Sequence, residues 1–278
     1  MRPKLIAFDL DGTLLDDEKG LPEENLSAML AAARAGVLLV PATGRIPKGL
    51  PEFLMVPGLF RYGIFSNGAE VLDLKEGKTL YQACIGPEQA VEICEYMDGL
   101  PVLYDCYRDG WGYMTQTMYE AAPSLLETEP QILRLLQRLR TPVPDLKEDI
   151  LAVGRPLQKL QMYFGQESLR ERDRQLRLLP ERFPSLAVSS SVRINIELNS
   201  RDARKGKALR ALCGALEIST ADCVAFGDGL NDVDLLRTAG RGCAMENASP
   251  EVRAAADAVV GSNNAAGVGK EIFRLLES

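Results

Sequence analysis

Residues 5–15, Leu-Ile-Ala-Phe-Asp-Leu-Asp-Gly-Thr-Leu-Leu, join a short apolar run to two carboxylates, Asp9 and Asp11, that stand two positions apart. The apolar run predicts a buried strand, and acids at the end of such a strand need solvent or a cation, because an unpaired buried charge is costly. Gly12 permits a sharp turn, and Thr13 can hydrogen-bond local backbone or an anion. These residues alone are compatible with a metal site and with an ordinary acidic turn.

The length and charge of the chain limit its class. A chain of 278 residues favours two domains, and 46% hydrophobic with 26% charged residues is typical of a soluble globular protein. The net charge of -7 argues against non-specific binding to nucleic acid or to an anionic membrane. No secretory signal is expected, because Asp9 and Asp11 interrupt the first apolar run. No membrane span is expected either, because no window of the sequence is long and apolar enough.

The chain contains no histidine, which excludes a Ser-His-Asp triad, a histidine general base and the histidine-based zinc hydrolases. Proton transfer must then fall to Asp, Glu, Lys, Tyr or Cys. The six cysteines are scattered without a C-x-x-C pair, so neither a zinc knuckle nor a disulfide framework is indicated. We therefore expect a reduced, cytoplasmic protein.

The first third of the chain alternates short apolar runs with a helical pattern. Strands are predicted over residues 4–8, 37–40 and 62–65, with a helix over 22–35, and this alternation is typical of a parallel sheet of βαβ units. Polar clusters follow the second and third strands, namely Thr43-Gly44-Arg45 and Ser66-Asn67-Gly68. Asn67 lies where it can line a crevice at the strand ends, although a turn role suffices to explain it.

The pattern changes in the middle of the chain. Residues 84–195 predict helices over 87–97 and 131–139, strands over 102–106, 111–115, 157–164 and 193–198, and a proline-containing loop over 141–144. We interpret this stretch as an inserted α+β domain. Its arginines alternate with acidic residues, which favours a solvated helix face over a nucleic-acid site: Arg170, Arg172, Arg174 and Arg177.

The βα alternation returns in the last third, so we expect residues 1–83 and 196–278 to share one sheet that residues 84–195 interrupt. A helix is predicted over 206–216, and a strand over 223–226 ends at Gly227-Asp228-Gly229. In an open parallel sheet, ligands bind beyond the carboxyl ends of the strands. The clusters at Asp9, Thr43, Lys205 and Asp228 are therefore expected to meet.

Four motifs carry a resemblance to a known family: D-x-D-G-T at Asp9, T-G-R at Thr43, K-G-x-A-L at Lys205 and G-D-G-x-N-D at Gly227. Together they resemble the motifs of the haloacid dehalogenase (HAD) superfamily, and the insertion between the second and third motifs resembles its Cof-type phosphatases. The resemblance implies an α/β, Rossmann-like core with strand order 5-4-1-2-3. It further implies a C2-type cap that sets substrate specificity, and magnesium-dependent hydrolysis of phosphomonoesters.

The resemblance also implies the roles of the acidic residues. Asp9 is expected to attack phosphorus and form an aspartyl-phosphate. Asp11 is expected to protonate the leaving oxygen while neutral and then to activate water, with its backbone carbonyl on the metal. Asp9 and Asp228 are expected to bind Mg²⁺ through their carboxylates. Asp232 either orients Lys205 or holds a metal-bound water.

The remaining candidates are expected to bind the phosphoryl group. Thr43 donates its hydroxyl and Lys205 neutralises charge, and Gly44 and Asn231 are also assigned to substrate binding. Structural roles stay open for several of these residues: Lys205 as a surface helix residue, Thr43 as a helix cap, and Asp228 with Asp232 as turn and N-cap residues.

The favoured function is hydrolysis of a small phosphorylated metabolite, such as a sugar phosphate, with no nucleic-acid, membrane or obligate protein partner. Two alternatives stay open, a phosphomutase-type transfer and a non-enzymatic phospho-receiver module. Asp11 favours an enzyme, because a signalling acceptor gains nothing from a general acid beside its nucleophile. The leaving group is not encoded in any motif of the chain.

Overall fold

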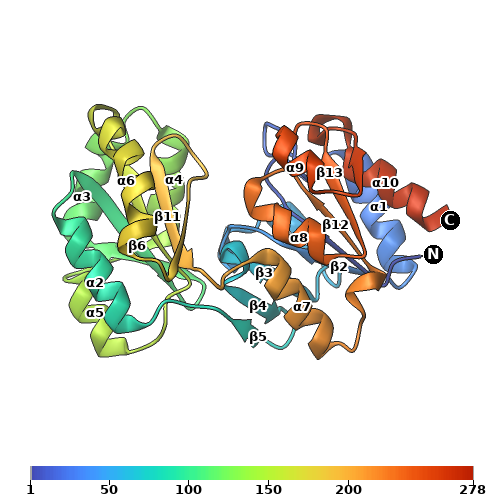
Figure 1. Cartoon of the computed structure of the whole chain (residues 1–278), viewed down its shortest axis with the longest axis horizontal. Coiled ribbons are helices and arrows are strands. Elements are labelled where there is room, and N and C mark those ends of the chain that lie inside the picture. The colour runs from blue at the N-terminus through green and yellow to red at the C-terminus, as the bar shows by residue number, and fades with distance from the viewer. Residues whose placement is uncertain (1, 278) are drawn as a thin grey trace. The chain divides into compact units, whose positions relative to one another are not determined.

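The computed structural model describes residues 2–277, which form two compact units. The core unit ends at Gln82 and resumes at Ala203, and the inserted unit is Ala83–Asp202 (Figure 1). The second boundary lies at 203 rather than at the expected 196. The reason is that β11 (Asn195–Ser200) pairs with β9 (Lys159–Phe164) and β10 (Leu186–Ser189), two strands of the inserted unit.

The core sheet has the order β14-β13-β12-β1-β2, and all of its strands are parallel. Their bounds are β1 Leu5–Phe8, β2 Leu38–Pro41, β12 Cys223–Gly227, β13 Arg241–Met245 and β14 Ala258–Val260. A parallel bridge between Ala42 and Ile64 attaches β3 (Tyr62–Phe65) beside β2, and β3 continues into an antiparallel sheet with β4 (Glu70–Asp73) and β5 (Lys78–Gln82). The expected order 5-4-1-2-3 is confirmed, with β14 as a further edge strand.

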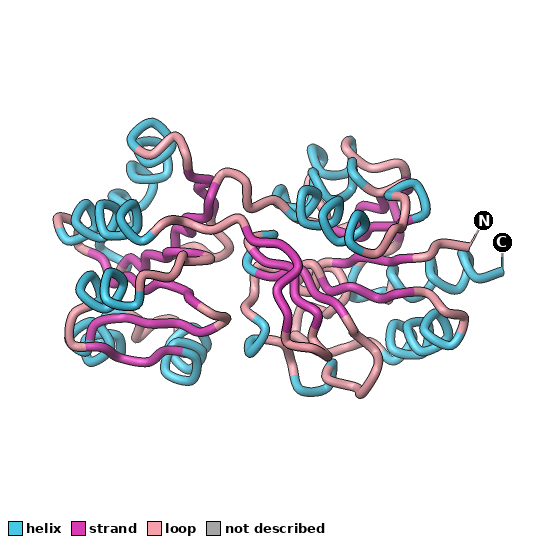
Figure 2. Tube along the Cα trace, turned by 90° about the horizontal axis from the view of Figure 1, so that it is seen from below, coloured by secondary structure: helices cyan, strands magenta, loops and turns pink. Residues whose placement is uncertain are grey.

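Helices cover both faces of this sheet, and its strands lie between them (Figure 2). Ile6 and Phe8 share a hydrophobic core with α1 (Glu23–Arg34) and α10 (Gly267–Glu277). Leu5 and Ala7 face the opposite core, formed with α7 (Lys205–Ala215), α8 (Val233–Thr238) and α9 (Pro250–Ala254). Because both faces of β1 are buried, the chain can place a carboxylate only beyond the strand end, which is the position of Asp9.

The inserted unit has a six-stranded mixed sheet of order β10-β11-β9-β6-β7-β8. The strands not yet given are β6 Val102–Arg108, β7 Trp111–Thr115 and β8 Arg140–Val143. Helices α2 (Pro87–Asp98), α5 (Leu146–Val153) and α6 (Leu169–Arg182) pack on one hydrophobic cluster, and α3 (Gln116–Leu125) and α4 (Pro130–Leu139) on another. An α/β core with an inserted α+β unit is thus confirmed.

One local prediction in the inserted unit was wrong, and one of its helices was not predicted. Residues 141–143, expected in a loop, belong to β8, which pairs in parallel with β7 at the edge of the sheet. Pro142 is tolerated there because an edge strand leaves some of its N–H groups outside the ladder. Helix α3 was not predicted, and Thr115 caps it by accepting a hydrogen bond from the Met118 N–H at 3.3 Å.

The arginine-rich stretch forms α6, where Arg172 pairs with Asp173 and Arg174 with Glu171, as the alternating charges predicted. All six cysteines are free thiols. Over residues 2–277, none of the helices combines the length and the apolar character needed to cross a bilayer.

Candidate active site

Three carboxylates converge at the carboxyl ends of β1 and β12. Asp9 follows β1, Asp228 follows β12, and Asp232 ends the short helix Leu230–Asp232. One oxygen of each lies within 4.8 Å of the others, a spacing at which the three can hold a metal ion. The two strands are neighbours in the sheet, and the Asp9 N–H donates to the Phe226 carbonyl at 3.1 Å. Sheet pairing therefore brings together acids that are far apart in the sequence.

Lys205 lies between two of these acids. Its Nζ is 2.9 Å from Asp9 Oδ1 and 2.5 Å from Asp232 Oδ1, and its side chain is 0% exposed. Burial disfavours the ammonium, but the charges of Asp232 and Asp9 outweigh it and raise the pKa of Lys205. Lys205 is therefore a buried cation rather than a surface residue of its helix.

Both carboxylate oxygens of Asp232 hold other groups in place. Oδ1 accepts from Lys205, and Oδ2 accepts from the backbone N–H groups of Asp228 at 3.0 Å and Gly229 at 2.9 Å. These contacts favour the orienting role for Asp232 over the role of a ligand to a metal-bound water.

The other two acids lie where a negative charge is disfavoured. Burial raises the pKa of Asp9 to about 7, although Lys205 acts against this shift. Burial also raises the pKa of Asp228. A hydrogen bond that Thr13 Oγ1 donates to Asp228 Oδ1 at 2.6 Å lowers this pKa but does not cancel the effect of burial. Gly12 has a φ of +80°, and a Cβ there would lie 2.4 Å from Asp228 Oδ2. The oxygen donors and the unfavourable negative charge fit a hard divalent cation such as Mg²⁺.

Asp11 has a different environment from the three clustered acids. Arg45 donates to both of its oxygens, from Nε at 2.8 Å and from Nη2 at 2.7 Å, and Lys19 Nζ lies 3.1 Å from Oδ1. Burial raises the pKa of Asp11, but these two cations outweigh burial and lower the pKa to about 2. The expected acid must be neutral in the first step and charged in the second, and the Arg45 and Lys19 contacts favour the charged form of Asp11.

The role of Arg45 was missed at the level of sequence, although the residue belongs to the T-G-R motif. Its third contact, from Nη1 to the Gly49 carbonyl at 2.9 Å, fixes the guanidinium between Asp11 and the loop that follows β2. The signal was an arginine two positions after Thr43. Lys19 lies outside the four motifs, so its contact with Asp11 had no signal in the sequence. It stands in an exposed loop and has a positive φ of 66°.

Thr43, Gly44 and Asn231 lie along the same edge of the core sheet. Thr43 follows β2 and is 1% exposed, and its Oγ1 accepts from the Arg45 N–H at 3.1 Å, which leaves the hydroxyl proton to be donated. Asn231 is exposed, and its Nδ2 donates to Asn67 Oδ1 at 3.0 Å. A Cβ on Gly44 would lie 2.8 Å from that same oxygen. Asn67 thus contacts two residues assigned to substrate binding, in line with the expectation that it lines the crevice at the strand ends.

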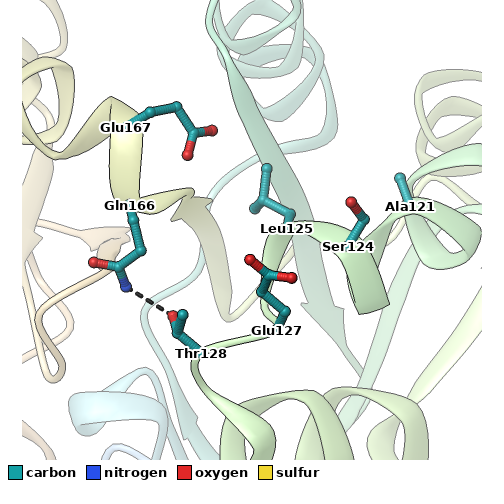
Figure 3. Close-up of a pocket in the computed structure, with 7 residues that line it drawn as sticks. All are labelled: Ala121, Ser124, Leu125, Glu127, Thr128, Gln166 and Glu167. Carbon is teal, nitrogen blue, oxygen red and sulfur yellow. Dashed lines mark hydrogen bonds between the residues drawn. The ribbon is translucent and has the colours of Figure 1, made fainter.

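A pocket of about 400 Å³ occurs in the inserted unit, where the end of α3 and the loop after it face residues 166–167 (Figure 3). Its lining includes Glu127 and Glu167, together with Thr128, whose Oγ1 accepts a hydrogen bond from Gln166 Nε2 at 2.9 Å. Two acidic side chains disfavour binding of a phosphate dianion. The acidic cluster of the core unit is the stronger candidate.

Comparison with known proteins places this geometry in a family context. A family model described as haloacid dehalogenase-like hydrolase matches residues 6–272. The chain is 30% identical over 295 residues to phosphatase YwpJ of Bacillus subtilis, covering 98% of this chain and 100% of that protein. It is 31% identical over 258 residues to an HMP-PP phosphatase of Yersinia pseudotuberculosis, covering 90% and 86%. A solved haloacid dehalogenase-like hydrolase from B. subtilis matches with a TM-score of 0.78 and 28% identity, covering 98% and 99%.

Proposed function

The chain belongs to the haloacid dehalogenase-like hydrolases and is a phosphatase for small phosphorylated metabolites, and from this premise we propose that it works through an aspartyl-phosphate formed on Asp9. The observation that carries the proposal is the Asp9 carboxylate, which Lys205 holds at 2.9 Å within the acidic cluster. A buried carboxylate fixed in one orientation is a suitable nucleophile for an in-line attack on phosphorus.

Two displacements complete the reaction. In the first, an Asp9 oxygen bonds to phosphorus, the ester P–O bond breaks, and the leaving oxygen takes a proton. In the second, water attacks the phosphorus and gives up a proton, the bond to Asp9 breaks, and phosphate is released. Lys205 neutralises charge on the phosphoryl oxygens, and Thr43 donates its hydroxyl to one of them.

Mg²⁺ is the cation we assign to this site, where the carboxylates of Asp9 and Asp228 and the backbone carbonyl of Asp11 would hold it. When bound, the ion neutralises charge on the transferring phosphoryl group and offsets its repulsion from the acids. Asp232 contributes indirectly by holding Lys205 and the backbone at residues 228–229.

Asp11 can donate a proton only after its contact with Arg45 loosens, because that contact keeps it ionised. A phosphate dianion offers Arg45 a competing partner of matching geometry, since guanidinium binds carboxylate and phosphate alike. Substrate binding would then free Asp11 to act as acid in the first displacement and as base in the second.

The identity of the leaving group depends on which phosphate ester the protein accepts. The Yersinia relative is by name an HMP-PP phosphatase, and the Bacillus relative is named only as a phosphatase. We assign selection of the ester to the inserted unit, which acts as a cap, and we expect a sugar phosphate or similar metabolite in a cytoplasmic setting. The proposed reaction requires no nucleic-acid, membrane or protein partner.

A panel of phosphate esters tests the proposal. The purified chain with Mg²⁺ should release inorganic phosphate from at least one phosphorylated sugar, nucleotide or cofactor, and Asp9→Asn should not. Asp173→Asn, an exposed acid on α6, is the matched control and should keep the wild-type rate. Activity retained in Asp9→Asn, or full activity in EDTA, would reject the assignment. Transfer of phosphate to a second position of a sugar, without release, would support a mutase instead.

A further inference from the structure

A left-handed segment lies beside the proposed phosphate site without a part in the mechanism above. Ser66, Asn67 and Gly68 have consecutive positive φ values of 49°, 61° and 93°, and all three are buried. Two successive non-glycine residues in this region carry a conformational cost. Contacts with the surrounding structure must therefore hold the segment in place.

Backbone hydrogen bonds tie this segment to the T-G-R motif. The Ser66 N–H donates to the Arg45 carbonyl at 3.0 Å, and the Asn67 N–H donates to the Thr43 carbonyl at 3.1 Å. The segment thus fixes the backbone that carries both the Thr43 hydroxyl and the Arg45 guanidinium.

Two other contacts reach the third and fourth motifs. A Cβ on Gly68 would lie 2.4 Å from the carbonyl carbon of Arg204 and 2.7 Å from the Lys205 nitrogen, so the segment packs directly on the start of α7. Asn67 Oδ1 accepts the hydrogen bond from Asn231 Nδ2 at 3.0 Å. One segment therefore contacts three stretches that supply phosphate-binding groups.

We propose that Asn67 is a positioning residue of the phosphatase, whose carboxamide orients Asn231 while its left-handed backbone fixes Thr43. This inference rests on the proposed function. Asparagine meets two demands at once, because it tolerates a positive φ and offers a neutral acceptor. Aspartate would bring a negative charge close to a phosphate dianion, and glycine would satisfy the backbone but leave Asn231 unheld.

The variant Asn67→Gly separates these two demands, because it removes the carboxamide and keeps the left-handed backbone. With p-nitrophenyl phosphate and Mg²⁺ as the probe, kcat/KM should fall roughly 5-fold, as expected for one lost hydrogen bond. Glu217→Gly is the matched control, since Glu217 also has a positive φ, of 55°, at the far end of α7. That control should stay within about twofold of wild type.

A double-mutant cycle then asks whether Asn67 acts through Asn231. Asn231→Ala should cost about as much as Asn67→Gly, and the double variant should lose no more than the larger single loss. An additive loss of roughly 25-fold would overturn the proposal, since the two side chains would then act independently. A lower melting temperature of Asn67→Gly with unchanged kcat/KM would overturn it as well, because that result describes a purely structural residue.

Wild type and Asp9→Asn, measured in parallel, distinguish a failure of the proposed function from a failure of the role given to Asn67. An active wild type and an inactive Asp9→Asn support the proposed function, and wild-type kinetics of Asn67→Gly would then overturn this inference alone. A wild-type protein that hydrolyses neither p-nitrophenyl phosphate nor any ester of the panel would overturn both.

Discussion

Replacing Lys205 by methionine removes a buried cation from between two carboxylates. The Nζ distances of 2.9 Å to Asp9 and 2.5 Å to Asp232 correspond to a gross attraction on the order of 6 kcal/mol each at an effective dielectric of 20. Desolvation of the three ions offsets most of this attraction. Breaking a buried pair and leaving the acids uncompensated typically costs about 3–5 kcal/mol, which is the loss we expect in the free energy of unfolding.

The loss should depend on pH in a defined direction. A carboxyl with a raised folded-state pKa favours folding below its unfolded pKa and loses that contribution as the pH rises through the folded value. Asp9 already has its pKa raised to about 7 by burial, and removal of Lys205 raises it further. The loss of stability should therefore be largest near pH 8 and smaller near pH 5, and Mg²⁺ should recover part of it.

Urea unfolding followed by circular dichroism measures this free energy. The fluorescence of Trp111, the single tryptophan, reports on the inserted unit and shows whether the loss is confined to the core unit. Lys270→Met is the control, because Lys270 forms a solvent-exposed pair with Glu24 at 3.8 Å that contributes only about 0–1 kcal/mol. If the two variants differed by less than about 1 kcal/mol at pH 8, the argument from a buried ion triad would be refuted.

Three further predictions concern the same site. The apparent dissociation constant of Mg²⁺, measured by calorimetry, should fall by up to about tenfold per pH unit between pH 5 and pH 7. The reason is that burial raises the pKa of Asp9 to about 7, and the ion binds the ionised carboxylate. A dissociation constant that does not change with pH would contradict this prediction. Arg45→Lys loses the two-point contact, so the pKa of Asp11 in a carboxyl NMR titration should rise from about 2 toward 3.8, and an unchanged value would count against the pairing. Gly68→Ala should destabilise the core unit by about 2 kcal/mol more than Gly58→Ala. Gly58 has a similar positive φ, but a Cβ there would meet no atom within 4 Å. Equal losses of stability in the two variants would show that Gly68 is not needed for close packing on the start of α7.

The positions of the acids followed from the sequence because a parallel sheet has a simple geometry. Asp9 and Asp228 each end an apolar run, and two such runs that become neighbours in a sheet bring their ends together. Lys205 could be placed at the start of a helix for the same reason. Its complete burial was not predictable, since it depends on two acids that fold around it from other segments.

Contacts set by loop geometry could not be predicted in this way. The two-point contact of Arg45 with Asp11 depends on how the loops after β1 and β2 turn, and the partner of Asn67 lies 164 positions away. The strand at residues 195–200 illustrates the same difficulty. Its alternation predicted a strand over residues 193–198 in the inserted stretch, but no local feature indicated that the whole strand belongs there, so the expected boundary at 196 falls within it.

The central claim is that phosphate passes through a covalent bond to Asp9, and the stereochemical course at phosphorus tests it most directly. A substrate with a chiral thiophosphate group, hydrolysed in isotopically labelled water, should give a product with retained configuration, because two in-line displacements each invert the centre. Inversion would show a single displacement by water and would contradict the assignment of Asp9 as nucleophile.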